Sequence, residues 1–296
     1  MITDRPPQLA VLPRSYGRQF ARVGIGFVVF LSVLWILVTG LLWANESRLV
    51  FRADWTHRFL QPGAFRTRSF AAADGQRLEG VVFSAPANDA RYWILFCPPS
   101  GASIHALRVH QQLETLRSFG YHVFAFDYRG FGRTDGTPDE DGVYADALGA
   151  YRYLTGTIGV PASRVILAGR SLGSAVAVET ALRVQAAGLM LFSPIDSVPL
   201  TAARLYPWAP VTWLATNQFD NGAKVARLHT PVLIVHAIND RLIPLSAARA
   251  LFQQIVAPKA MLETSGGHNR AGFASPTELE EAMRRFWPPL GSRVAE

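Results

Sequence analysis

Cysteine is almost absent from this chain of 296 residues. The single cysteine, Cys97, excludes an intramolecular disulfide, a cysteine-rich zinc module and an iron–sulfur cluster built from this chain alone. The sequence also lacks internal repeats and low-complexity tracts, and 49% of its residues are hydrophobic, which excludes a disordered or fibrous protein. Its length suits one large domain or two small ones.

Charge is sparse and unevenly placed. Lysine and arginine total 29 against 22 aspartates and glutamates, which gives a formal net charge of +7. More than half of this excess lies in residues 1–52, where six arginines stand against two acidic residues. The rest of the chain shows no basic cluster interleaved with aromatic residues, so we expect no nucleic-acid partner.

Formal charge is missing altogether between Arg22 and Glu46. As a helix, this run spans about 30 Å of hydrocarbon, which is more than the apolar part of a secretory signal provides. Leu42 and Ala44 make a poor cleavage site. We therefore expect a basic segment at 1–22 and a transmembrane helix at 23–45, while a cleaved signal and a buried core helix stay as alternatives.

The orientation of this span follows less directly from charge. Four arginines precede it, but Arg48, Arg52 and Arg58 follow closely, so the positive-inside bias is nearly balanced. We expect a single-pass membrane protein with its N-terminus inside and its larger part extracytoplasmic.

Beyond residue 52, short apolar runs alternate with helical patterns. The turn signal Asp74-Gly75 predicts a hairpin, and later runs are typical of strands that are buried on both faces. Helical periodicity predicts helices over Ile104–Phe119 and Asp139–Leu154. The expected strands are Thr67–Ala72, Leu78–Ser84, Tyr92–Cys97, Tyr121–Asp127, Val165–Ala168, Leu189–Phe192, Val232–Val235 and Lys259–Glu263.

This alternation predicts an α/β fold with a mostly parallel sheet and helices on both faces. We expect one domain over residues 53–296. Prolines and aromatic residues interrupt the alternation at 196–228, which indicates a small apolar cap insertion.

A nucleophile motif stands where one of these strands meets a helix. Gly169-Arg170-Ser171-Leu172-Gly173 is G-x-S-x-G in a strand–turn–helix context, and its small residues allow the close backbone approach of a sharp elbow. This geometry exposes the hydroxyl of Ser171 and turns the amide of Leu172 toward a developing oxyanion.

A serine nucleophile needs a base and an orienting acid, which follow it along the chain in this arrangement. Asp240 lies in the loop after the run Val232–Val235, and His268 lies in a glycine-containing loop after Lys259–Glu263. The alternatives are a turn residue for Asp240 and a solvated loop histidine for His268. His236 is the second choice of base, although its place at a strand end favours a packed imidazole.

These motifs together resemble the α/β-hydrolase superfamily. The stretch Phe126–Gly136, which reads FDYRGFGRTDG, the elbow at Ser171 and the loops of Asp240 and His268 are similar to a membrane-anchored branch related to the serine aminopeptidase-like "hydrolase 4" domain. Some animal members of that branch are protein depalmitoylases and lysophospholipid lipases. The resemblance covers about residues 66–287 and implies a catalytic triad of Ser171, Asp240 and His268.

One turn departs from the pattern of the branch. A His-Gly-Asn-like turn usually supplies an oxyanion amide there, but this chain has Cys97-Pro98-Pro99-Ser100-Gly101. Because proline has no N–H, the amide of Ser100 is the expected donor, with that of Gly101 as second choice. The two prolines either stiffen this turn or mark a remodelled oxyanion hole.

Two further residues near the nucleophile allow more than one interpretation. The resemblance makes Asp127 an architectural residue that fixes its loop through backbone hydrogen bonds, rather than a catalytic one. Arg170 either contacts an anionic substrate or points away from the cleft.

The sequence thus predicts two-step acyl transfer that requires no metal or organic cofactor. We expect an acyl ester or thioester substrate, with lipid-like or acylated compounds favoured by the anchor and the apolar cap. A serine peptidase of aminopeptidase type and a non-catalytic, membrane-tethered scaffold are the alternatives.

Overall fold

The structure is a computed structural model that describes residues 14–56, 66–86 and 90–288. The chain divides into two compact units, with the boundary between Asn45 and Glu46. Residues 1–13, which form most of the predicted basic N-terminal segment, lie outside the described residues.

The first unit contains one long helix, α1 (Arg14–Ala44). Its stretch Arg22–Ala44 is long and apolar enough to cross a membrane, and a signal sequence near an N-terminus meets the same criteria. Only 6% of the apolar window is buried. A core helix would bury most of its side chains, so the alternative of a core helix is not supported.

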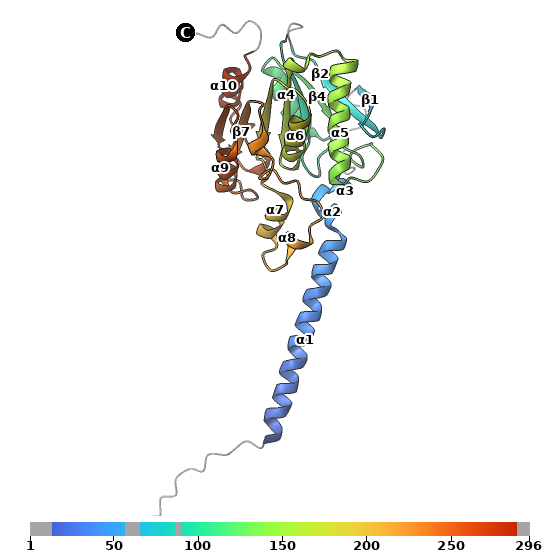
Figure 1. The fold of residues 1–296 in the computed structure, drawn as a ribbon, viewed down its shortest axis with the longest axis vertical. Helices are drawn as coiled ribbons and strands as arrows, with labels where there is room; N and C mark the ends of the chain where they lie inside the picture. Colours follow the sequence, from blue (N-terminus) through green and yellow to red (C-terminus); the bar gives the residue numbers. More distant parts are fainter. Residues whose placement is uncertain (1–13, 57–65, 87–89, 289–296) are drawn as a thin grey trace, which may run out of the picture. The chain divides into compact units, whose positions relative to one another are not determined.

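The second unit is built on one sheet of eight strands, in the spatial order β1-β2-β4-β3-β5-β6-β7-β8 (Figure 1). The first two strands form the predicted antiparallel hairpin, β2 also runs antiparallel to β4, and all other neighbours are parallel. The predicted mostly parallel α/β sheet is therefore confirmed. The strands are β1 (Thr67–Ala71), β2 (Arg77–Phe83), β3 (Trp93–Cys97), β4 (His122–Phe126), β5 (Val165–Arg170), β6 (Gly188–Phe192), β7 (Val232–Ala237) and β8 (Lys259–Thr264).

Helices cover both faces of this sheet. Side chains of β3 alternate between two hydrophobic clusters, with Leu95 in one and Ile94 and Phe96 in the other. The first cluster includes residues of α5 (Glu140–Arg152), α6 (Leu172–Arg183) and α9 (Leu245–Gln254), and the second includes residues of α4 (Leu107–Ser118) and α10 (Pro276–Phe286). Every residue of β5, β6 and β7 is buried, which explains their near-continuous apolar sequences.

The beginnings of two helices differ from the expectation. α4 begins three residues later than predicted because the Ile104 amide donates to Asp127 Oδ1 at 2.8 Å, which holds the preceding residues in a turn. α5 begins at Glu140, and Asp139 is its N-cap, with a side chain that accepts a hydrogen bond from the Gly142 amide at 2.6 Å.

The apolar cap insertion lies in the connection between β6 and β7 and contains two short helices, α7 (Val198–Leu205) and α8 (Val211–Leu214). Its base packs beside the start of α6, since the Ile195 amide and Asn221 Nδ2 both donate to Ser174 Oγ at 3.3 Å. Trp213 is 89% exposed. Other exposed apolar side chains of the insertion are Leu200, Leu205, Trp208 and Leu214.

Two short helices, α2 (Glu46–Phe51) and α3 (Ala53–Thr56), begin the second unit. The Glu46 carboxylate accepts hydrogen bonds from the backbone amides of Thr216 and Asn217 and from both of their side chains, at 2.6 to 3.1 Å. The first residue of α2 therefore holds the far end of the apolar insertion.

Candidate active site

The strand–turn–helix at Ser171 has the geometry of a nucleophile elbow. Ser171 adopts φ 52° and ψ −119°, a strained conformation for a residue other than glycine, between β5 and α6. A Cβ on Gly169 would lie 2.0 Å from the Gly173 carbonyl oxygen, and one on Gly173 would lie 2.2 Å from the Cys97 carbonyl oxygen. Both positions therefore require glycine.

The three residues of the predicted triad come together at this elbow. His268 Nε2 lies 2.9 Å from Ser171 Oγ, and His268 Nδ1 lies 2.8 Å from Asp240 Oδ2. When Nδ1–H donates to the carboxylate, Nε2 is left as the acceptor of the serine proton. Asp240 is in the turn after β7, and His268 follows β8. Together with Ser171 after β5, the three residues therefore lie at the carboxyl ends of three strands of the sheet.

The environment of Asp240 keeps it ionised. Burial opposes ionisation, but hydrogen bonds from His268 and from the backbone amides of Ile243 and Leu242 hold its pKa below the usual range. Both amides donate to Oδ1 at 2.9 Å, which leaves Oδ2 for the imidazole. The carboxylate is thus fixed in the orientation that selects the histidine tautomer.

Comparison with known proteins agrees with this geometry. Residues 89–221 match the Hydrolase_4 family, described as serine aminopeptidase, S33. The chain is 30% identical over 220 residues to the α/β hydrolase domain-containing protein 17B of Homo sapiens, with 74% of each chain covered. The chain belongs to the α/β-hydrolase superfamily.

Two further comparisons give one similar sequence and one similar fold. An uncharacterized protein of Mycobacterium tuberculosis is 33% identical over 214 residues, which cover 72% of this chain and 75% of that protein. The Pyrococcus furiosus esterase Pf2001 shares the fold with a TM-score of 0.62 at 17% identity, over 75% of this chain and 88% of that chain.

The turn after β3 leaves the expected oxyanion donor of this α/β hydrolase, the Ser100 amide, free of an acceptor among the described residues. The Gly101 amide, the second choice from sequence, donates to the Phe51 carbonyl at 2.8 Å, and Ser100 Oγ donates to the Val50 carbonyl. The Ser100 amide itself donates to no described residue. The second expected oxyanion donor is the amide of Leu172. Leu172 is the first residue of α6, where helix amides have no intrahelical partner.

Asp127 holds the segment that directly follows this turn. Its carboxylate accepts from Ser103 Oγ at 2.7 Å and from the Ile104 amide at 2.8 Å, and the side chain is fully buried. Burial raises the pKa of Asp127 to about 7 against the effect of these hydrogen bonds. These contacts agree with its expected architectural role, because they hold the segment that follows Ser100.

Arg170 braces the histidine loop and does not reach solvent. Its side chain is buried, and Nη1 donates to Gln112 Oε1 at 2.8 Å and to the Asn269 carbonyl at 3.1 Å. Gln112 Nε2 donates to the same carbonyl at 2.9 Å, so the residue after His268 is held twice. Of the two interpretations of Arg170, the structure supports the side chain that points away from the cleft.

Other residues near the site have supporting positions. His236 is fully buried, and its Nε2 lies 3.0 Å from the Ile243 carbonyl oxygen, as expected of a packed imidazole rather than a second base. Ser193 Oγ donates to the His268 carbonyl at 3.1 Å, a contact that sequence analysis missed. The only sequence signal for Ser193 is its place directly after the β6 run.

The remaining candidate groups do not suggest other chemistry. Burial raises the pKa of the Cys97 thiol to about 12, which makes it a poor nucleophile. Within the described parts of the chain, no three histidine, cysteine or acidic residues converge as metal ligands.

Proposed function

We propose that this chain is a membrane-anchored serine hydrolase that cleaves carboxylic esters or thioesters through an acyl-enzyme. One observation carries the proposal: a serine on a strained elbow, an imidazole and an ionised carboxylate are joined by hydrogen bonds of 2.9 and 2.8 Å. Such a chain of contacts activates a hydroxyl that is otherwise a weak nucleophile.

The mechanism follows from the positions of the groups. His268 takes the proton of Ser171 as its oxygen attacks the acyl carbonyl, and Asp240 stabilises the imidazolium that forms. The amides of Leu172 and Ser100 hold the oxyanion. His268 then gives its proton to the leaving oxygen or sulfur, and a water molecule activated by the same histidine releases the acyl group from Ser171.

An apolar acyl group suits the surroundings of the site. The insertion, whose base packs beside α6, exposes large apolar side chains such as Trp208 and Trp213. The similar Pyrococcus furiosus protein is named an esterase. Lipid-like or acylated substrates are therefore favoured over small polar ones.

The apolar helix supplies the membrane attachment in this proposal. The stretch Arg22–Ala44 matches the thickness of a bilayer core and stays uncleaved, with the second unit on the extracytoplasmic side. The bilayer is then the surface from which the enzyme draws its substrate.

A fluorophosphonate probe tests the catalytic part of the proposal. We expect the full-length protein in detergent to label, Ser171→Ala to abolish labelling and lower ester turnover about 10⁴-fold or more, and Ser163→Ala, which removes an exposed hydroxyl, to behave as the parent. Failure of the folded parent to label, or labelling that survives Ser171→Ala, contradicts the proposal and favours a non-catalytic scaffold.

Substrate preference distinguishes an ester or thioester hydrolase from a peptidase. Short and long p-nitrophenyl esters are compared with an aminoacyl amide. We expect the esters to turn over faster, with a gain for the longer acyl chain. A strong preference for the amide overturns the choice of ester and thioester substrates.

A further inference from the structure

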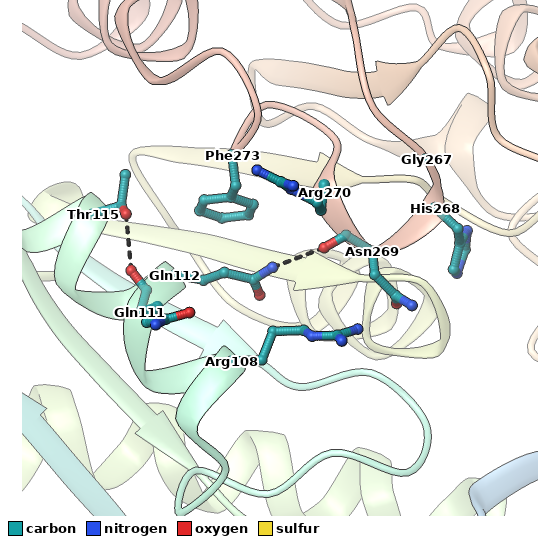
Figure 2. A pocket seen from close by; sticks show the side chains of 9 residues that line it. All are labelled: Arg108, Gln111, Gln112, Thr115, Gly267, His268, Asn269, Arg270 and Phe273. Atoms are coloured by element: carbon teal, nitrogen blue, oxygen red, sulfur yellow. Dashed lines mark hydrogen bonds between the residues drawn. The ribbon is translucent and has the colours of Figure 1, made fainter.

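An open pocket lies beside the histidine of the site, between α4 and the loop after β8 (Figure 2). Its volume is about 620 Å³. The α4 residues in its wall lie at positions i, i+3, i+4 and i+7 and therefore share one face of the helix. The lining residues are Arg108, Gln111, Gln112, Thr115, Gly267, His268, Asn269, Arg270 and Phe273.

The charge of this pocket is one-sided. Arg108 comes from the helix and Arg270 from the loop, while none of the described lining residues is acidic. Neither arginine forms an ion pair with a described residue.

 Six other described arginines form ion pairs, and none of them lines the pocket. They are Arg117, Arg129, Arg183, Arg204, Arg249 and Arg284.

A third arginine adds positive charge behind the pocket wall. Arg170 is 3% exposed, and its guanidinium bonds only to neutral acceptors on Gln112 and Asn269, both of which line the pocket. Its Nε has no hydrogen-bond partner among the described residues. Burial and the charge of Arg108 lower the pKa of Arg170 to about 10, so the group is still protonated at neutral pH.

Three cations without a carboxylate make a site that attracts an anion. A buried charge without a partner is costly, and a nearby anion offsets part of that cost. The hollow also concentrates the field of the exposed arginines Arg108 and Arg270. Side-chain amides of Gln111 and Asn269 add neutral hydrogen-bond donors to the same walls.

The position of the pocket says which part of a substrate it receives. His268 lines the pocket and also contacts Ser171 Oγ. In acyl transfer the histidine delivers its proton to the leaving group, so the leaving group lies on the histidine side of the carbonyl. A group seated in the pocket therefore belongs to the leaving alcohol or thiol rather than to the acyl chain.

We propose that this pocket binds an anionic group, a phosphate or a carboxylate, on the leaving group of the substrate, with Arg108 and Arg270 as its charged ligands. This inference rests on the proposed function, because it names a part of the substrate of the same serine hydrolase. Arg170 acts from behind the wall by holding Gln112 and Asn269 in place.

A matched set of butyrate esters tests this inference. All share a three-carbon alcohol that ends in a hydroxyl, a carboxylate, a phosphate or a trimethylammonium group, and all are soluble without micelles. For the full-length protein in neutral detergent, we expect kcat/KM to be about tenfold or more higher for the anionic esters than for the hydroxyl ester, and lowest for the cationic ester. The two anionic arms tell phosphate from carboxylate.

Arginine variants locate the effect in the pocket. Arg108→Gln and Arg270→Gln are each expected to remove most of the anionic preference through a higher KM. Arg164→Gln is the matched control, because this exposed arginine directly precedes β5 and so lies at the opposite edge of the sheet from Ser171. It should keep the parent's preference.

Each outcome separates the inference from the proposed function. Equal kcat/KM for the anionic and hydroxyl esters overturns the anion pocket, and so does an anionic preference that survives both pocket variants. In either case, hydrolysis of the hydroxyl ester still supports the proposed serine hydrolase. Absence of turnover for every ester, together with no fluorophosphonate labelling, overturns both.

Discussion

Asp127 is a buried carboxyl whose protonation should couple stability to pH. Its pKa is raised to about 7 by burial, against the hydrogen bonds from Ser103 and Ile104, whereas an unfolded chain releases this proton near pH 4. The folded state therefore binds the extra proton between these values. Its contribution to stability is fully present below about pH 4 and is lost as the pH rises through about 7.

Substitution of Asp127 by Asn tests this coupling. Asparagine does not titrate, so we expect the unfolding free energy of the parent to fall relative to Asp127→Asn as the pH rises from 5 to 8. The limiting slope is about 1.4 kcal/mol per pH unit. Denaturant unfolding of both proteins in detergent at each pH measures the difference, and a difference that is constant with pH contradicts the assignment.

At the scale of elements, the elbow and the turn after β3 are packed backbone against backbone. A Cβ at position 173 would lie 2.2 Å from the Cys97 carbonyl oxygen and 2.5 Å from that of Pro98. Neither oxygen can move without shifting the turn that carries Ser100. In the proposed mechanism, this close packing of α6 against the turn holds the amides of Leu172 and Ser100 in a fixed relation, so that both can donate to one oxyanion.

Gly173→Ala is therefore expected to damage both stability and catalysis. We expect a loss of about 1–3 kcal/mol in unfolding free energy, as for other overpacked sites, and a loss of ester turnover larger than that loss of stability explains. Gly156→Ala is the control, since a Cβ there meets nothing within 4 Å. Thermal unfolding and initial rates of the two variants decide the matter, and equal behaviour of both would count against this packing role.

The sequence predicted the parts of the fold and site that depend on local pattern. Apolar runs marked the strands, and the small residues around Ser171 marked the elbow. The late start of α4 and the brace on Asn269 could not be predicted, because they depend on contacts from Asp127 and Arg170, which are distant in sequence. Helices α9 and α10 were missed as well, although each presents buried apolar residues to the sheet.

At the scale of the whole molecule, the location of the proposed enzyme depends on whether the apolar helix is retained as an anchor or cleaved as a signal. If α1 is an anchor, the protein from membranes keeps its N-terminus, resists extraction by alkaline carbonate and has the mass of the full chain, 32.5 kDa. If it is a cleaved signal, the mature protein is shorter and soluble. Intact-mass measurement of the purified protein distinguishes the two, and loss of the first residues through Ala44 would refute the anchor.

The side of the membrane follows from labelling of whole cells. We expect a membrane-impermeant fluorophosphonate to label Ser171 in intact cells, with Ser171→Ala as the unlabelled control. Label that appears only after lysis places the site on the cytoplasmic side, contrary to the proposed orientation.

The contacts of α2 constrain the number of residues in this helix more than the identity of its side chains. Glu46 holds Thr216 and Asn217 through its carboxylate, while Val50 and Phe51 hold Ser100 and Gly101 through backbone carbonyls that any residue would supply. One inserted or deleted residue between Glu46 and Val50 would turn the later carbonyls by about 100° around the helix axis. Evolution can therefore exchange the exposed side chains of this segment freely, but it cannot change their number without loosening the insertion or the turn beside the nucleophile.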